Sequence, residues 1–313
     1  MMPNPFVFGP RIEDPAQFIG REHELRHIFN ALETAHSGQL QHVSIVGPRR
    51  IGKSSLLFHI QQVYPRYLRR PEQYHILFID LDDARCHTLT GLLRYILHRL
   101  NLPVDEKPSL AQFQEIVERR YRREGPYLVL CLDEFEHLTS RREEFPDAFY
   151  DSLRSLAANN RLGLITASKT PLDQLAFQGK LTSPFFNIFH LLPLGEFTPQ
   201  ETDALLDIGR RCDRPFSEEE CRRIKALAGN HPAKLQIAAG LLYEAKDDAT
   251  VDWGQLESEY RRQCDFIFSE AIPVQRSPSF PRRAWRFLTG EGPLALGRFL
   301  LEIFGRENFS DTT

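Results

Sequence analysis

The chain has 313 residues, of which 42% are hydrophobic and 26% are charged, and its formal net charge is -3 at pH 7. This is ordinary globular composition for one large domain and one small domain, and the lack of a basic field gives no support for nucleic-acid binding. The five cysteines are scattered without a C-x-x-C pair, no signal peptide opens the sequence, and no apolar run approaches a membrane span. These features predict a reduced, cytoplasmic protein.

The first two thirds of the sequence alternate between strand and helix patterns. Residues 1–17 are rich in proline and predict an extended lead-in, and a helix is expected from residue 18 to about residue 36. Strand patterns that alternate with helical ones predict a parallel sheet covered by helices on both faces, with ligands at the carboxyl ends of the strands. The expected strands are 42–46, 74–81, 127–132, 161–166 and 187–192, and the expected helices between them are 53–68, 89–100, 109–123 and 145–158.

The residues between the first strand and the next helix match the phosphate-binding pattern G-x-x-x-x-G-K-[ST]. Glycines allow the backbone N–H groups to face an anion, and the helix that follows points its positive end at the phosphates. Lys53 would reach the β- and γ-phosphates, and the Ser54 hydroxyl would ligate Mg²⁺. The predicted nucleotide contacts are Gly47, Pro48, Arg49, Arg50, Ile51, Gly52, Lys53, Ser54 and Ser55.

Two carboxylates follow the strand expected at 127–132. Asp133 at the strand tip would hold the water shell of the Mg²⁺ bound at Ser54. Glu134 would polarise the water that attacks the γ-phosphate and so act as the catalytic base. An acidic pair after a strand can also be a solvated loop start. The sequence lacks the Asn-Lys-x-Asp base-reading pattern of GTPases, which favours ATP as the nucleotide.

From Pro199 the sequence predicts helices at 200–212, 217–228 and 232–245 with no strand between them. Ser217 followed by Glu220 predicts a capping box at one of these helices. A further helix is expected at 253–268, then a proline-rich linker at 273–281 and a short amphipathic helix at 294–304. The expected divisions are a lead-in (1–17), an α/β domain (18–195), a helical lid (196–250) and a C-terminal helical extension of unclear fold (251–313).

Four segments in this order resemble the STAND and archaeal-type ATPases, near the origin-recognition branch of AAA+ proteins. They are residues 18–25, 47–56, 130–134 and 229–232, and the resemblance spans about residues 5–245. It implies an α/β fold of the P-loop NTPase type, with a parallel five-stranded sheet flanked by helices and a small helical lid domain after it. It also implies ATP/ADP and Mg²⁺ as cofactors and slow ATP hydrolysis.

The same resemblance implies contacts at the base of the nucleotide. Phe18, Ile19 and Gly20 would lie against the adenine, although they could equally form a helix start that packs on the sheet. His231 and Pro232 would lie beside the nucleotide and link its state to the position of the lid. A helix stop followed by a helix start also explains these two residues in chemical terms.

Three further roles are implied near the phosphates. Thr166, Ser168 and Lys169 stand where relatives carry a polar sensor followed by a basic residue. A lysine here departs from the frequent arginine and lacks its bidentate fork. Arg154 would be an arginine finger that acts within an oligomer, or otherwise an ordinary surface residue on a helix.

Three functions remain open from the sequence. The first is an ATP-driven switch that controls assembly of a homo-oligomer or engagement of a separate protein effector. The second is a DNA-associated ATPase, and the third is a scaffold that holds nucleotide without turnover. His23-Glu24-Leu25-Arg26-His27 also matches the zinc-protease pattern H-E-x-x-H, but it overlaps the resemblance at 18–25 and has no third ligand nearby in sequence.

Overall fold

The computed structural model describes residues 3–6, 8–121, 125–160, 162–246 and 251–269. The expected linker at 273–281 and the expected helix at 294–304 lie outside these residues. All the elements described below belong to one unit, Met1–Phe268.

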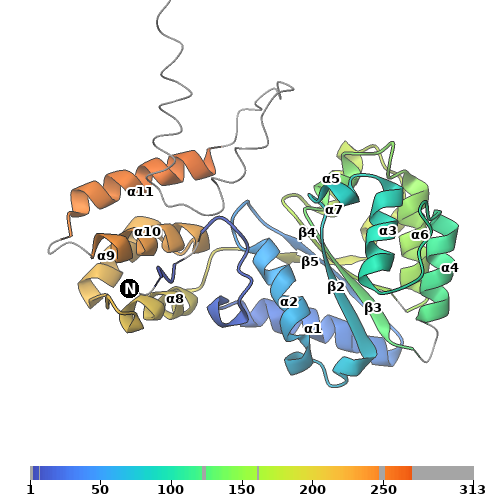
Figure 1. Ribbon diagram of the computed structural model, residues 1–313, viewed down its shortest axis with the longest axis horizontal. Coiled ribbons are helices and arrows are strands. Elements are labelled where there is room, and N and C mark those ends of the chain that lie inside the picture. The colour runs from blue at the N-terminus through green and yellow to red at the C-terminus, as the bar shows by residue number, and fades with distance from the viewer. Residues whose placement is uncertain (1–2, 7, 122–124, 161, 247–250, 270–313) are drawn as a thin grey trace, which may run out of the picture. The chain divides into compact units, whose positions relative to one another are not determined.

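The strand patterns form one five-stranded sheet in the order β2-β3-β4-β1-β5, and all neighbouring strands are parallel (Figure 1). The strands are β1 (His42–Val46), β2 (Tyr74–Asp80), β3 (Tyr127–Asp133), β4 (Leu162–Ser168) and β5 (Phe189–Pro193). The predicted parallel sheet is confirmed, with strand ends shifted by one or two residues. β3 and β4 run on to polar residues because Asp133 pairs with Asp80 and Ser168 pairs with Val46.

Helices cover both faces of this sheet. Residues of β3 alternate between two cores because successive side chains of a strand point to opposite faces. Leu128, Leu130 and Leu132 join one core, while Val129 and Cys131 join the other. Figure 1 shows α1 (Glu22–Glu33) and α2 (Lys53–Tyr67) on one face, and α3 (Leu89–Arg99), α4 (Leu110–Arg120) and α6 (Asp147–Ala158) on the other.

The start of the first helix was predicted wrongly, and two short helices were missed. The first helix begins at Glu22 and not at residue 18, because Gly20 and Arg21 have φ angles of 72° and 66° and so cannot continue a right-handed helix. Two short helices, α5 (Glu136–Thr139) and α7 (Leu172–Gln178), were not expected. They are too short to give a clear helical period in the sequence.

After β5 the chain forms a bundle of helices, here called the helical bundle. It consists of α8 (Pro199–Arg211), α9 (Glu218–Ala228), α10 (Pro232–Ala245) and α11 (Trp253–Phe268). Capping boxes begin α8 at Thr198 and α9 at Ser217, where each hydroxyl accepts from a backbone N–H at the third helical position. Helix α11 shares the bundle core through Leu256 and Tyr260.

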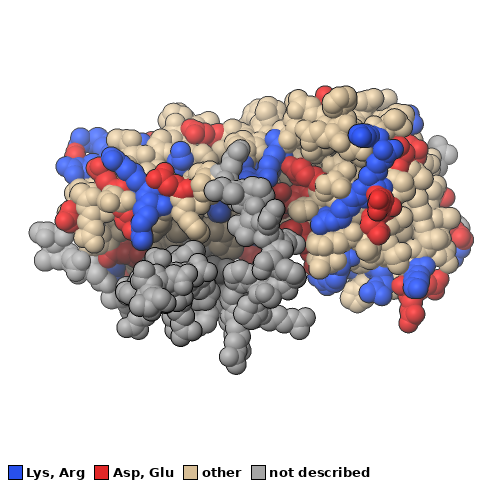
Figure 2. Space-filling view, turned by 90° about the horizontal axis from the view of Figure 1, so that it is seen from above, with Lys and Arg blue, Asp and Glu red and all other residues tan. Residues whose placement is uncertain are grey.

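None of the helices within the described ranges is long and apolar enough to cross a membrane. On the face shown in Figure 2, the Lys and Arg side chains of the described residues lie among Asp and Glu side chains.

Candidate functional site

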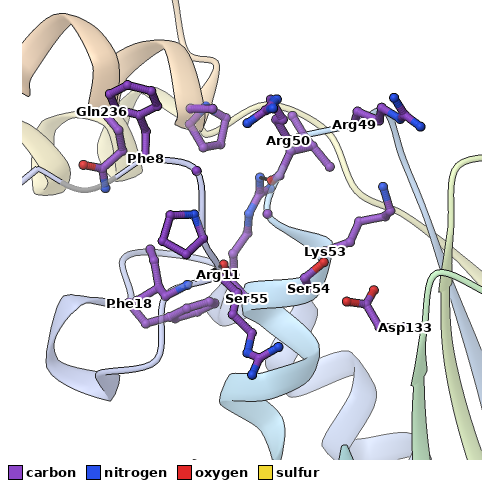
Figure 3. A pocket seen from close by; sticks show the side chains of 18 of the residues that line it. Phe8, Arg11, Phe18, Arg49, Arg50, Lys53, Ser54, Ser55, Asp133 and Gln236 are labelled. Atoms are coloured by element: carbon purple, nitrogen blue, oxygen red, sulfur yellow. Dashed lines mark hydrogen bonds between the residues drawn. The ribbon is translucent and has the colours of Figure 1, made fainter. Parts of the chain in front are cut away.

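A cavity of about 710 Å³ lies at the carboxyl ends of the strands, where side chains from the sheet, the lead-in and the helical bundle meet (Figure 3). Open parallel sheets place ligands at this edge. The cavity is lined by the loop after β1 and, from α10, by Pro232, Ala233 and Gln236. The cavity is therefore lined by both folded parts of the chain.

The loop after β1 turns directly into α2, which begins at Lys53. Arg50 and Gly52 have φ angles of 63° and 101°, the left-handed conformations that let consecutive backbone N–H groups face one anion. The Lys53 ammonium donates to the carbonyl oxygens of Gly47 (2.9 Å) and Pro48 (3.0 Å). All of the predicted loop residues from Arg49 to Ser55 line the cavity, whereas Gly47 and Pro48 meet Lys53 through their carbonyls.

Lys53 is only 5% exposed, and burial is the main cause that lowers the pKa of its ammonium. The carboxylates of Glu134, Glu136 and Asp133 oppose this shift, and Lys169 adds to it. A buried cation surrounded by backbone carbonyls and carboxylates is suited to receive a strongly anionic ligand.

Gly47 has no room for a side chain. A Cβ at this position would lie 2.5 Å from the carbonyl oxygen of Leu194. Leu194 is itself held to the end of β1 by a 2.7 Å hydrogen bond from its N–H to the Val46 carbonyl.

We therefore expect Gly47→Ala to destabilise the fold by roughly 1–3 kcal/mol, and to lower the midpoint of thermal unfolding by roughly 5 °C. Gly195→Ala is the matched control, since no atom lies within 4 Å of its Cβ. Equal midpoints for both variants would contradict the prediction.

Asp133 and Glu134 follow one another at the end of β3 but have different surroundings. Asp133 is 3% exposed, and burial raises the pKa of its carboxyl to about 6, against a hydrogen bond from Ser54 that lowers it. Glu134 is half-buried and has a φ of 51°, and its N–H donates to the Asp133 carboxylate at 3.1 Å. The left-handed backbone at Glu134 turns the chain so that both carboxylates line the cavity.

The raised pKa of Asp133 makes stability depend on pH. Between about pH 4 and pH 6 the unfolded chain loses this proton before the folded chain does, so the free energy of unfolding falls as the pH rises. The loss is up to about 3 kcal/mol across that window. In Asp133→Asn this slope is expected to disappear, and chemical denaturation at several pH values would measure it. Asp173→Asn on exposed α7 is the control, and an unchanged slope in Asp133→Asn would refute the assignment.

Polar residues that the sequence analysis missed lie beside this pair. Asp80 at the end of β2 is in register with Asp133 and lines the cavity. Asp82 and His137 also line it, and the His137 Nε2 lies 3.4 Å from the Asp82 carboxylate. A second strand ending in Asp was a usable signal for Asp80, whereas only the fold brings His137 close to Asp82.

The far end of the cavity is apolar. Phe18 and Ile19 line it, as predicted for base contacts, and the Phe18 ring stacks on His59 at 3.9 Å between centroids. Gly20 does not line the cavity, and a Cβ there would lie 2.5 Å from the Glu201 carboxylate. Figure 3 shows Phe18 and Gln236 at the opposite end from Lys53 and Asp133.

Arg21 connects the phosphate-binding loop to the segment that leads into the helical bundle. Its side chain is 4% exposed and donates to the carbonyl oxygens of Ile51 (3.1 Å) and Gly195 (2.7 Å). Its guanidinium also lies 4.8 Å from the centre of the Phe197 ring. Because Gly195 and Phe197 belong to the link between β5 and α8, Arg21 ties that link to the phosphate-binding loop.

Of the two residues predicted to link the nucleotide to the lid, Pro232 lines the cavity and His231 does not. His231 is 8% exposed, burial lowers its pKa, and its ring meets Phe268 edge-on at 5.0 Å.

Four further predicted residues do not line the cavity. Thr166 is fully buried, and the Ser168 hydroxyl donates to the Thr170 carbonyl at 2.7 Å. The Lys169 N–H donates to the Glu136 carboxylate. Arg154 is exposed on α6 and lines a separate cavity of about 320 Å³ with residues at the start of β1, at the amino ends of the strands. The structure thus does not bring Arg154 to the site of its own chain.

The H-E-x-x-H pattern lies on α1, with His23 and His27 exposed. Within the described ranges no group of three His, Cys, Asp or Glu side chains could hold a metal ion. The pattern therefore has no third ligand among these residues.

A parallel sheet, a phosphate-binding loop that opens α2, and an acidic end of β3, which β4 separates from β1, define a P-loop nucleoside triphosphatase with a helical bundle. A family model described as novel STAND NTPase 2 matches residues 37–262. The chain belongs to this family, which confirms the resemblance to STAND and archaeal-type ATPases.

Solved structures share this fold. The ORC2 protein of Aeropyrum pernix, in its ADPNP-ADP complexes, has a TM-score of 0.63 and 17% identity over 86% of this chain and 71% of that chain. The Walker-type ATPase PABY2304 of Pyrococcus abyssi has a TM-score of 0.60 and 17% identity over 84% and 77% of the two chains. The ORC1 protein of A. pernix in complex with DNA has a TM-score of 0.56 and 16% identity over 95% and 80%. No curated protein matches the sequence.

Proposed function

We propose that this protein binds ATP with Mg²⁺ in the 710 Å³ cavity, hydrolyses it slowly to ADP and phosphate, and uses the difference between the two states as a switch. The observation that carries the proposal is that Lys53, Ser54, Asp133 and Glu134 line one cavity that the helical bundle also lines. The bundle side includes Pro232 and is therefore placed to respond to what the cavity contains.

The phosphates are assigned to the loop end of the cavity. The Lys53 ammonium would exchange the carbonyls of Gly47 and Pro48 for the β- and γ-phosphates, at little cost because it is already desolvated. The backbone N–H groups at the start of α2 favour the same anion. The two exposed arginines at the loop tip, Arg49 and Arg50, would extend this positive surface.

Ser54 and Asp133 would hold Mg²⁺, since their hydroxyl and carboxylate oxygens are hydrogen-bonded to each other in the buried site and are hard ligands of the kind this ion prefers. The bound ion would neutralise charge on the β- and γ-phosphates. Glu134 is the proposed base: its carboxylate accepts a proton from the attacking water, whose oxygen bonds to the γ-phosphorus while the bond to the β–γ bridging oxygen of ADP breaks.

The base of the nucleotide is assigned to the apolar end, against Phe18 and Ile19. Ser168 ends β4, the strand between β3 and β1, and Lys169 follows it, so we assign these two residues to sensing the γ-phosphate. Arg154 is exposed and distant from the cavity of its own chain, and its proposed role is to reach the nucleotide of a neighbouring copy.

The proposed output is assembly into a homo-oligomer or capture of a separate protein effector. The similarity to ORC1 in complex with DNA concerns the fold, and a net charge of -3 gives no support for a nucleic-acid partner.

Multi-angle light scattering of the wild type and of Glu134→Gln, each with ADP and with ATP·Mg²⁺, tests the switch. A larger species that forms only with ATP and persists in the variant supports it. The same mass under all conditions, with nucleotide bound throughout, would contradict nucleotide-controlled assembly.

A further inference from the structure

The residues before Phe18 form part of the cavity wall. The consecutive residues Phe8, Gly9, Pro10, Arg11 and Ile12 line it, together with Gln17. Figure 3 shows Phe8 near Gln236 and Arg11 alongside the start of α2. Residues 3–6 and 8–13 are here called the N-terminal strap, because the two ends of this segment are attached to different parts of the molecule.

One end of the strap is anchored in the helical bundle. Phe6 is 4% exposed within the bundle core, and its ring stacks on Phe216 at 5.5 Å and an interplanar angle of 15°. The Asn4 side-chain amide donates to the Gly240 carbonyl and to the Glu244 carboxylate, both at 3.2 Å. This anchor combines apolar burial with hydrogen bonds to α10.

The other end is anchored on α2, beside the phosphate-binding loop. The Ile12 N–H donates to the Ser55 hydroxyl at 3.0 Å, and the Gln62 side chain donates to the Glu13 carbonyl at 2.7 Å. Ser55 directly follows Ser54, the proposed ligand of Mg²⁺. This end of the strap is therefore bonded to the helical turn that is proposed to receive the phosphates.

Arg11 adds an electrostatic contact at the same end. Its guanidinium lies 3.6 Å from the Asp80 carboxylate and 4.7 Å from the centre of the Phe58 ring. Asp80 is in register with Asp133 in the sheet and contributes to the raised pKa of that carboxyl. The strap thus contacts both the loop side and the acidic side of the site.

The bundle has a second tie to the sheet, the link between β5 and α8. The Leu194 N–H donates to the Val46 carbonyl at 2.7 Å, and the Phe197 N–H donates to the Asn230 carbonyl at 2.9 Å. A further tie joins the Arg21 N–H to the Glu201 carboxylate on α8. Each tie restricts rotation of the bundle about the link, so the strap limits this rotation until one of its anchors yields. The α2 end of the strap is polar and partly exposed, and the bundle end is buried, so the α2 end is the one that yields.

We propose that the N-terminal strap couples occupancy of the cavity to the position of the helical bundle, by gaining or losing its bonds to Ser55 and Asp80. This rests on the proposed function, since it requires nucleotide phosphates at Lys53 and Ser54. With ATP·Mg²⁺ the start of α2 and the acidic strand ends are held together and the strap is fixed between them. With an empty cavity the α2 end is released more often.

Amide hydrogen exchange of the full chain tests this, without nucleotide, with ADP·Mg²⁺ and with a non-hydrolysable ATP analogue and Mg²⁺. The Ile12 amide is expected to exchange about fivefold to tenfold more slowly with the analogue than without nucleotide. Residues 194–198 are expected to change in the same titration, because the bundle turns about them.

Two variants remove contacts that anchor the strap in the helical bundle, at residues that do not line the cavity. Asn4→Ala and Phe6→Ala are expected to keep the affinity for the analogue within about twofold while the exchange at 194–198 stops depending on nucleotide. Asn159→Ala and Phe177→Ala are the controls, since both side chains are exposed on the other domain. If Phe6→Ala fails to fold, Asn4→Ala carries the test.

The outcomes separate the strap from the site. No binding of the analogue to the wild type would overturn the proposed function, and the coupling with it. Binding with an unchanged Ile12 amide would overturn the strap alone. A nucleotide response at 194–198 that survives in the Asn4→Ala and Phe6→Ala variants would also overturn the strap alone.

Discussion

Replacing Lys53 by alanine is expected to lower the affinity for ATP·Mg²⁺ by about 100-fold, on the order of 3 kcal/mol. The ammonium is buried, and in the proposed complex it makes charge-assisted bonds to two phosphates. The effect should be smaller for AMP, which has no β- or γ-phosphate. Isothermal titration calorimetry with ATP, ADP and AMP measures the three affinities.

Lys107→Ala is the matched control, because that lysine is exposed in a loop remote in sequence from the site. It removes the same charge and leaves the cavity intact. If the Lys53 variant bound ATP as tightly as the Lys107 variant, the assignment of the phosphates to the loop after β1 would be wrong.

Glu134→Gln is expected to slow ATP hydrolysis by about 10²- to 10⁴-fold while the affinity for ATP changes by less than about threefold. The amide keeps the size and the left-handed backbone of Glu134, at a φ of 51°, but it cannot accept the proton of the attacking water. Phosphate release under single-turnover conditions separates this chemical step from binding and product release.

Glu143→Gln, on an exposed turn, is the control and should hydrolyse ATP at the wild-type rate. Unchanged turnover in Glu134→Gln would remove Glu134 from the mechanism. If turnover were already undetectable in the wild type, with ATP bound, the protein would be a nucleotide-holding scaffold, the third alternative that the sequence left open.

The phosphate-binding loop could be predicted because its chemistry is local. A buried strand, a glycine-rich turn and a helix beginning at Lys53 are consecutive in the chain, so the pattern from Gly47 to Ser55 specifies both the backbone and the ligand. The position of Asp133 and Glu134 at the carboxyl end of β3 was predictable for the same reason, since the buried strand and the acidic pair are consecutive in the chain. The difference in their burial was not visible in the sequence.

The strap and the residues around Asp80 required the fold. Asn4 and Gly240 are 236 positions apart, and no period or motif connects them. Asp80 and Asp133 meet because β2 and β3 are neighbours in the sheet, and strand order is a property of packing. The fold also decided the place of Arg154. The resemblance implied an arginine finger at this residue, and α6 places it at the amino ends of the strands, away from the cavity of its own chain.

By itself the sequence determined the alternation of strands and helices, the change to a helical bundle after β5, and the loop that matches the phosphate-binding pattern. These follow from hydrophobic period, capping and short motifs, which act over a few residues. Only the tertiary structure decided which side chains share the cavity, that Lys53 and Asp133 are desolvated there, and that the N-terminal strap closes one wall. Burial and contact between distant segments arise when the elements pack, and no local pattern encodes them.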